Sequence, residues 1–119
     1  MNKKNPYEHL RRPGIDEHVE MLITPYKVID IYKSEQEEIQ LLVAHSLQNH
    51  YTFGYRITFK SGRKADRSPN LESGWFRNTD EAVLYFLGLI ISCEQWFTPE
   101  LITEVKKLCV KYGQCNLFL

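Results

Sequence analysis

The stretch TDEAVLYFLGLIIS, residues 79–92, decides the fold class of this chain. Asn78 or Thr79 caps its start, because either side chain accepts a hydrogen bond from a backbone N–H group of the first turn. Residues 82–91 are apolar without interruption, so the stretch predicts a helix that is apolar on every side. Such a helix needs cover all round, either from the rest of the chain or from another molecule.

A second helix is predicted directly downstream of the first. Thr98 serves as its cap, and Pro99 takes the first helical position. Phe97 and Ile102 flank the cap as a hydrophobic staple. Gly113 stands where a helix stop belongs, because glycine readily adopts the left-handed conformation that ends a helix. The sequence therefore predicts a helix that begins at Pro99 and ends at Gly113.

Alternating side chains upstream of these helices predict a hairpin. In residues 51–60 aromatic and aliphatic residues alternate with polar ones, which places the apolar set on one face of a strand. Ser61 and Gly62 predict a hairpin turn, because glycine accepts a positive φ. Residues 63–68 then return antiparallel until Pro69, which ends the pairing.

The segments nearer the N-terminus predict one strand and two helices. Residues 26–32 are rich in β-branched and aromatic side chains and have the length of a strand. Ser34 and Glu37 match a capping box, and the apolar residues that follow share one face, which favours a helix over residues 35–48. Helical spacing of apolar residues also predicts a short helix over residues 15–23.

The predicted elements together specify an α+β fold in a single domain. Their order is α-β-α-β-β-α-α, with a small antiparallel sheet of about three strands packed by three to four helices. The chain of 119 residues is long enough for one hydrophobic core and too short for two. Residues 15–119 are expected to form this domain. Residues 1–14 are basic and interrupted by proline and glycine, and they predict a flexible arm.

Composition and charge restrict the classes of function. The chain carries 15 Lys and Arg residues against 15 Asp and Glu residues, so no global charge steers it toward nucleic acid or an acidic surface. Its three cysteines have no CxxC spacing, which argues against a disulfide framework and favours a cytoplasmic location. The longest apolar run is about half the length of a membrane-spanning helix, so no membrane contact is expected.

Basic residues cluster in one part of the sequence. Between residues 56 and 77 six basic residues and two acidic ones give a local net charge of +4. The basic ones are Arg56, Lys60, Arg63, Lys64, Arg67 and Arg77. They are candidates for contacts with nucleic-acid phosphates, although charges on a strand edge also keep it from pairing with another chain. Arg56 and Lys60 are predicted on the opposite face from the aromatic residues, whereas single-strand binding needs both kinds on one surface.

Acidic residues gather earlier in the chain. Between residues 16 and 38 the local net charge is −5, so the chain is polarised along its sequence. The acidic and basic segments could compensate each other within one molecule, between two copies, or through a partner of opposite sign. Compensation within the fold is the expectation.

Four aromatic residues flank the apolar helix. They are Trp75, Phe76, Trp96 and Phe97. Together with the helix they supply more apolar surface than a sheet of three strands covers, and aromatic anchors are typical of protein interfaces. These residues are therefore candidates for an interface with a partner protein or with a second copy of the chain. The expectation is that the chain itself covers the helix, and self-association is the alternative.

Nothing in the sequence indicates a cofactor, a metal centre or a catalytic group. His45 and His50 are five positions apart, which misses the spacing of a helical ligand pair. Phosphate-binding, dinucleotide-binding and hydrolase motifs do not occur. The expected function is a small non-catalytic binding or adaptor module that acts through protein contacts. The alternative is a nucleic-acid-binding protein that uses residues 56–77, and an enzyme is the third hypothesis.

Overall fold

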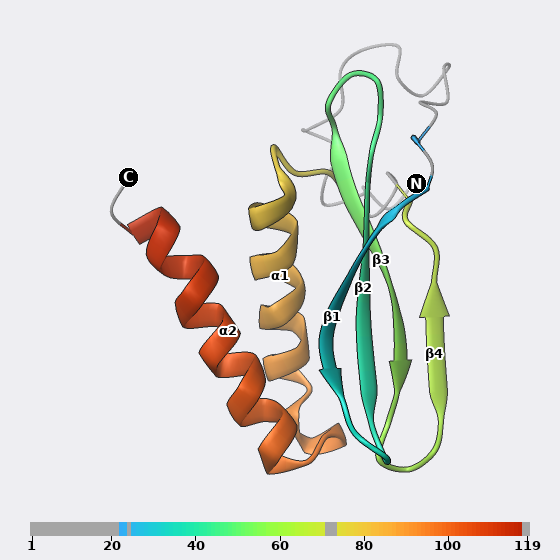
Figure 1. The fold of residues 1–119 in the computed structure, drawn as a ribbon, viewed down its shortest axis with the longest axis vertical. Helices are drawn as coiled ribbons and strands as arrows, with labels where there is room; N and C mark the ends of the chain where they lie inside the picture. The colour runs from blue at the N-terminus through green and yellow to red at the C-terminus, as the bar shows by residue number, and fades with distance from the viewer. Residues whose placement is uncertain (1–21, 24, 71–73, 118–119) are drawn as a thin grey trace, which may run out of the picture.

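The computed structural model describes residues 22–23, 25–70 and 74–117, with side chains up to residue 113. The strands are β1 (Lys27–Lys33), β2 (Glu38–His45), β3 (Tyr51–Thr58) and β4 (Lys64–Arg67). The helices are α1 (Thr79–Ser92), the short 3-10 helix η4 (Glu94–Trp96) and α2 (Pro99–Leu117). The four strands form one antiparallel sheet in the order β1-β2-β3-β4, and both α-helices lie on the same face of it (Figure 1).

The α+β class is confirmed, but the predicted numbers of elements are wrong. Within the described residues the sheet has four strands instead of about three, and two α-helices pack on it instead of three to four. The predicted helix over residues 15–23 lies almost wholly outside the described residues, as does the predicted arm over residues 1–14. The described part of that helix, Leu22 and Ile23, runs beside the end of β2, where Leu22 bridges Ser46.

The extra strand is the segment for which a helix was predicted. Residues 35–48 contain β2, which pairs with β1 on one side and β3 on the other. Its residues 41–44 are all buried, so both faces of this central strand are covered and its sequence reads as an apolar run instead of an alternation. The Ser34 hydroxyl does accept the backbone N–H of Glu37, at 3.0 Å, but this bond closes the turn between β1 and β2.

The predicted hairpin of β3 and β4 is confirmed. Phe53 and Ile57 point into the core from β3, as the alternation requires. The turn contains Gly62 with a φ of 91°, and the Phe59 N–H donates to the Arg63 carbonyl at 2.8 Å. After β4 the chain crosses the opposite face of the sheet, so close to β3 that a Cβ atom on Gly54 would lie 2.1 Å from the Arg67 carbonyl oxygen.

The two helices begin where the sequence predicts. Asn78 caps α1 by accepting the backbone N–H of Glu81 at 2.9 Å, and the Thr98 hydroxyl accepts the Leu101 N–H at the start of α2. The predicted end of α2 at Gly113 is wrong, because the helix continues to Leu117. Gly113 does not take the positive φ that a glycine stop requires, so it lies in the helix like any other residue.

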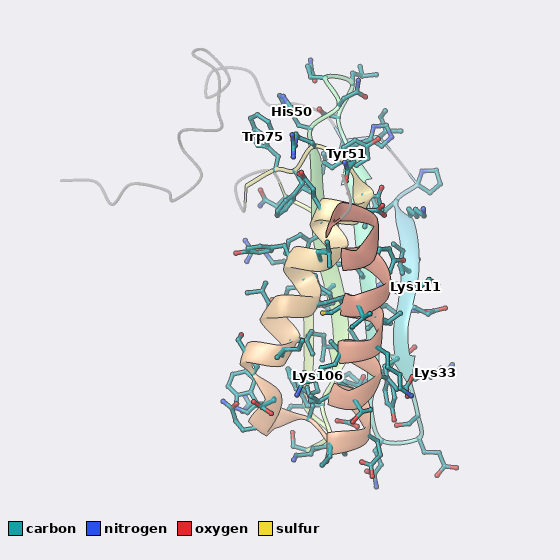
Figure 2. All side chains as sticks on the ribbon, turned by 90° about the vertical axis from the view of Figure 1, so that its left-hand side faces the viewer. Lys33, His50, Tyr51, Trp75, Lys106 and Lys111 are labelled. Carbon is teal, nitrogen blue, oxygen red and sulfur yellow. The ribbon has the colours of Figure 1, made fainter. Side chains whose placement is uncertain are left out.

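The core lies between the helices and the sheet. Its buried side chains are Ile31, Ile39, Leu41, Val43, Phe53, Ile57, Ala82, Val83, Phe86, Leu87, Ile90, Phe97, Leu101, Ile102 and Val105. Helix α1 lies over β2 and β3 and helix α2 lies beside it over β1, as the side view shows (Figure 2). Neither helix in the described part of the chain combines the length and apolar composition needed to cross a bilayer.

The expectation that the chain itself covers α1 on every side is wrong. Tyr85 and Leu89 are each 40% exposed, and Gly88 between them is exposed as well. The reason is geometric, because two helices side by side on one face of a sheet leave the outward side of each helix in solvent. Part of the apolar surface of α1 therefore remains exposed on the outside of the molecule.

A buried carboxylate ties the turn between β1 and β2 to the start of α2. Glu37 is 2% exposed, and its two carboxylate oxygens accept hydrogen bonds from Thr98, one from the backbone N–H at 2.9 Å and one from the hydroxyl at 2.5 Å. The capping function that the sequence assigned to Glu37 thus exists, but it serves a helix 61 residues away. This contact holds the β1–β2 turn against the segment between η4 and α2.

Candidate functional site

A groove of about 450 Å³ lies between the β3–β4 turn and η4. Its lining residues are Phe59, Lys60, Ser61, Arg63, Lys64, Ala65, Gln95 and Trp96. Both segments lie at the end of the sheet where β3 stops and β4 starts, at the bottom of the ribbon view (Figure 1). The groove therefore combines part of the predicted basic cluster with one of the predicted interface aromatics.

The end of β3 brings aromatic and basic side chains to the same place. The ring of Phe59 packs on Phe97 with 5.3 Å between centroids and meets the edge of Trp96 at 5.9 Å. Because β3 ends at Thr58, Lys60 belongs to the turn, and its ammonium group lies 3.4 Å from the carbonyl oxygen of Phe97. The prediction that Lys60 shares the solvent face of the strand with Arg56 is therefore wrong, since the alternation stops with the strand.

Trp96 is the exposed aromatic side chain of the groove. It is 54% exposed although its ring touches Phe59. Its backbone is held in place, because the Trp96 N–H donates to the Cys93 carbonyl at 2.9 Å and η4 ends on the buried Phe97. A large aromatic ring on a fixed backbone offers contact area at a small loss of conformational freedom.

The charge of the groove has one sign. Lys60, Arg63 and Lys64 contribute three cations, and no Asp or Glu residue is among the lining residues. Concentrated positive charge next to an apolar wall attracts anions and raises their local concentration. The groove is thus suited to a ligand that carries both carboxylate or phosphate groups and an apolar or aromatic part.

The other predicted basic residues lie elsewhere. Arg56 stands directly opposite Asp66 across β3 and β4, and Arg67 pairs in register with Tyr55. Arg77 precedes α1 and forms a salt bridge of 2.6 Å with Glu81. Hydrogen bonds from the side chain and backbone of Arg77 lower the pKa of Glu81. The pair therefore stabilises the fold at pH values at which Glu81 is ionised, and this stabilisation is lost as the pH falls through the lowered pKa.

The predicted interface aromatics are divided between the two ends of the sheet. Trp75 stacks on His50 with 3.9 Å between ring centroids, and both lie with Tyr51 at the end opposite the groove (Figure 2). Phe76 pairs with Tyr51 through two backbone hydrogen bonds. Phe97 is only 3% exposed, so it supports the groove from inside the core.

No candidate metal site is found in the described residues. Residues 22–23, 25–70 and 74–117 contain no group of three or more His, Cys, Asp or Glu residues that could hold a metal ion. Burial raises the pKa of the Cys109 thiol, which lowers its fraction of reactive thiolate at neutral pH. Within the described residues we therefore take the groove, with its aromatic wall and three cations, as the candidate site.

Comparison of the chain with protein-family models, with curated proteins and with solved structures finds no match. The candidate site is therefore defined by its own geometry and charge.

The sign of the charge at the groove predicts how Trp96 responds to ionic quenchers of fluorescence. In a Trp75→Phe variant Trp96 is the sole tryptophan, since the chain has two. We expect iodide to quench its emission about twofold more efficiently than caesium at low salt, because the three cations attract the anion. Reversing two charges, Arg63→Glu with Lys64→Glu, should invert this preference. Equal quenching by both ions in the Trp75→Phe variant would contradict the assigned surroundings of Trp96.

Proposed function

We propose that this chain is a non-catalytic binding module that docks an acidic segment of a partner protein in the groove at η4. An apolar or aromatic side chain of the partner packs on Trp96 and Phe59. Carboxylates on either side of it pair with Lys60, Arg63 and Lys64. The observation that carries the proposal is the half-exposed Trp96 in a groove whose lining residues include three cations and no Asp or Glu.

The residue types of the groove support a protein partner. Tryptophan and arginine are the side chains that contribute most often to the hot spots of protein interfaces. The rim position of the cations favours fast, salt-dependent association, whereas the aromatic wall supplies the contact area. The groove volume of about 450 Å³ lies in the range of pockets that hold a drug-sized ligand, which leaves room for one large side chain.

The distribution of charge favours a short acidic segment over a nucleic acid. Binding of a single strand uses a basic groove that follows the backbone over several nucleotides, with aromatic residues along it. Here the cations of the groove are three neighbours on one turn, Arg56 faces Asp66, and Arg77 is neutralised by Glu81. These positions do not continue the groove into a longer basic track.

The test uses a synthetic acidic peptide with one central phenylalanine, titrated into the full chain at low salt. We expect saturable binding that weakens as salt is added, because exposed charges are screened. The Arg63→Glu, Lys64→Glu double variant should bind at least about tenfold more weakly, which corresponds to about 1.4 kcal/mol. The matched control is Arg56→Glu, which reverses a charge on the other face of the sheet and should leave the affinity unchanged.

Two further probes separate the alternatives. A peptide with lysine in place of every acidic residue should not bind, and one with alanine in place of phenylalanine should bind more weakly. An oligothymidylate that binds the groove while the acidic peptide does not would overturn the proposal in favour of nucleic-acid binding. Equal binding of the acidic and the lysine peptide, or full binding by the double variant, would also overturn it.

A further inference from the structure

The polar side chains among the described residues that line the groove are all hydrogen-bond donors. Lys60, Arg63 and Lys64 are cations, and Ser61 and Gln95 carry a hydroxyl and an amide group. A charged lysine or arginine side chain accepts no hydrogen bond, and these lining residues include no Asp or Glu. The lining therefore matches a ligand group that only accepts hydrogen bonds and carries more than one negative charge.

A phosphate group has these properties to a greater degree than a carboxylate. A phosphorylated residue carries a charge of about −1.5 to −2 at pH 7 and three strong acceptor oxygens, whereas a carboxylate carries one charge and two oxygens. The guanidinium group of Arg63 presents N–H groups in a plane that pair with two phosphate oxygens at once, and lysines add point charges. Because Lys60 and Lys64 flank the same turn as Arg63, one phosphate suits the three cations together.

The aromatic wall of the groove lies next to these cations. The ammonium group of Lys60 lies 3.4 Å from the carbonyl oxygen of Phe97, the residue that follows Trp96. Phe59 precedes Lys60 in the chain, and its ring lies 5.9 Å from that of Trp96 between centroids. Trp96 is 54% exposed, so part of its ring is open to another aromatic ring. A side chain that joins an aromatic ring to a phosphate would contact the wall and the cations together.

We propose that the groove recognises a phosphotyrosine in the partner segment. The inference rests on the proposed function and narrows its ligand. The ring of the phosphotyrosine packs on Trp96, and its phosphate pairs with Arg63 and the two lysines. Phosphoserine suits the groove less well, because its short side chain brings no ring to the wall. An acidic segment without phosphate is then the weaker ligand, and phosphorylation of the partner controls the affinity.

One carboxylate lies close to the groove in the sequence. Glu94 is exposed in η4, two positions before Trp96, but it is not among the lining residues. Its charge repels a bound phosphate, so we expect Glu94→Gln to strengthen binding of a phosphotyrosine peptide about twofold. Asp80→Asn is the matched control, because it removes an exposed carboxylate at the start of α1, the end of that helix away from η4. This control should leave the affinity unchanged.

The test titrates peptides of one uncharged sequence into the full chain by calorimetry, with phosphotyrosine, tyrosine or phosphoserine at the centre. We expect the phosphotyrosine peptide to bind at least about tenfold more tightly than the other two. Adenosine monophosphate, which joins a phosphate to an aromatic base without a peptide, should also bind at least about tenfold more weakly. Equal binding of the tyrosine peptide, or tighter binding of the nucleotide, would overturn the proposal.

The uncharged background separates this test from that of the proposed function. If the acidic peptide with phenylalanine binds and the phosphotyrosine peptide does not, this inference fails and the proposed function stands. If only the phosphotyrosine peptide binds, recognition of the phosphate is supported, and the carboxylates are removed from the proposed function.

The second ionisation of the phosphate gives an independent readout. Its pKa is about 6 in a free phosphorylated residue, and cations that bind the dianion lower it. The added affinity is therefore present above the free pKa and is lost as the pH falls from the free to the bound pKa. Phosphorus NMR should show this lowered pKa in the complex. Arg63→Gln with Lys64→Gln should abolish both the lowered pKa and the tight binding, whereas Arg56→Gln should change neither. An unchanged phosphate pKa, or a double variant that binds like the wild type, would overturn the proposal.

Discussion

Replacing Gly54 with alanine is expected to lower the free energy of unfolding by about 3 kcal/mol, the upper end of what overpacking usually costs. The added Cβ atom would lie 2.1 Å from the Arg67 carbonyl oxygen and 2.6 Å from the Pro69 nitrogen. Both are backbone atoms, so no side-chain rotation relieves the contact and the segment over β3 has to move away. That movement also strains the hydrogen bond of 2.9 Å from the Thr52 hydroxyl to the Asn70 carbonyl.

Urea denaturation followed by circular dichroism measures this loss. The matched control is Gly113→Ala, because a Cβ atom on Gly113 meets nothing within 4 Å and alanine favours the helix in which it lies. We expect the control to be unchanged or more stable by up to about 1 kcal/mol. If the two variants had the same stability, the close approach of the chain to Gly54 would be contradicted.

Replacing Glu37 with alanine is expected to cost about 3 kcal/mol of unfolding free energy. The substitution removes two hydrogen bonds to a charged acceptor and leaves the Thr98 N–H and hydroxyl without their partner at the start of α2. The loss also loosens the β1–β2 turn against the start of α2, which directly follows the η4 segment that forms one wall of the groove. Glu37→Gln keeps the shape and one acceptor, so its cost should be smaller.

Glu35 provides the control for this experiment. It lies in the same turn but is exposed, so Glu35→Ala should change the stability by no more than about 0.5 kcal/mol. The two alanine variants differ in whether the lost side chain is buried against Thr98 or exposed in the turn. A Glu37→Ala variant as stable as Glu35→Ala would show that the contact does not hold the start of α2.

The sequence predicts those elements whose signals are local. The caps Asn78 and Thr98 and the glycine turn at Gly62 act within a few residues, and the structure has each where the pattern places it. The segment that contains β2 could not be assigned in this way. Its residues 41–44 are apolar on both faces because both faces are buried there by parts of the chain distant in sequence, and the bond of Glu37 to Thr98 depends on a contact across 61 positions.

The groove was only partly predictable for the same reason. Lys60, Arg63, Lys64 and Trp96 are all candidates in the sequence, but as members of two unrelated clusters. The turn at Gly62 is the sequence signal that could have corrected the placement of Lys60. It ends the alternation of β3 before Phe59 and Lys60, so both residues belong to the turn. The approach of η4 to this turn follows from tertiary packing of Phe59 on Phe97 and has no local signal.

The most direct test of the groove as the binding site is the indole N–H resonance of Trp96 in the Trp75→Phe variant. This variant gives a single indole signal, since the chain has two tryptophans. On addition of the acidic peptide we predict that the signal moves in a saturable way, together with the backbone amides of residues 59–65. A peptide that binds while these signals stay fixed, or that moves only signals near His50 and Trp75, would contradict the assignment of the groove.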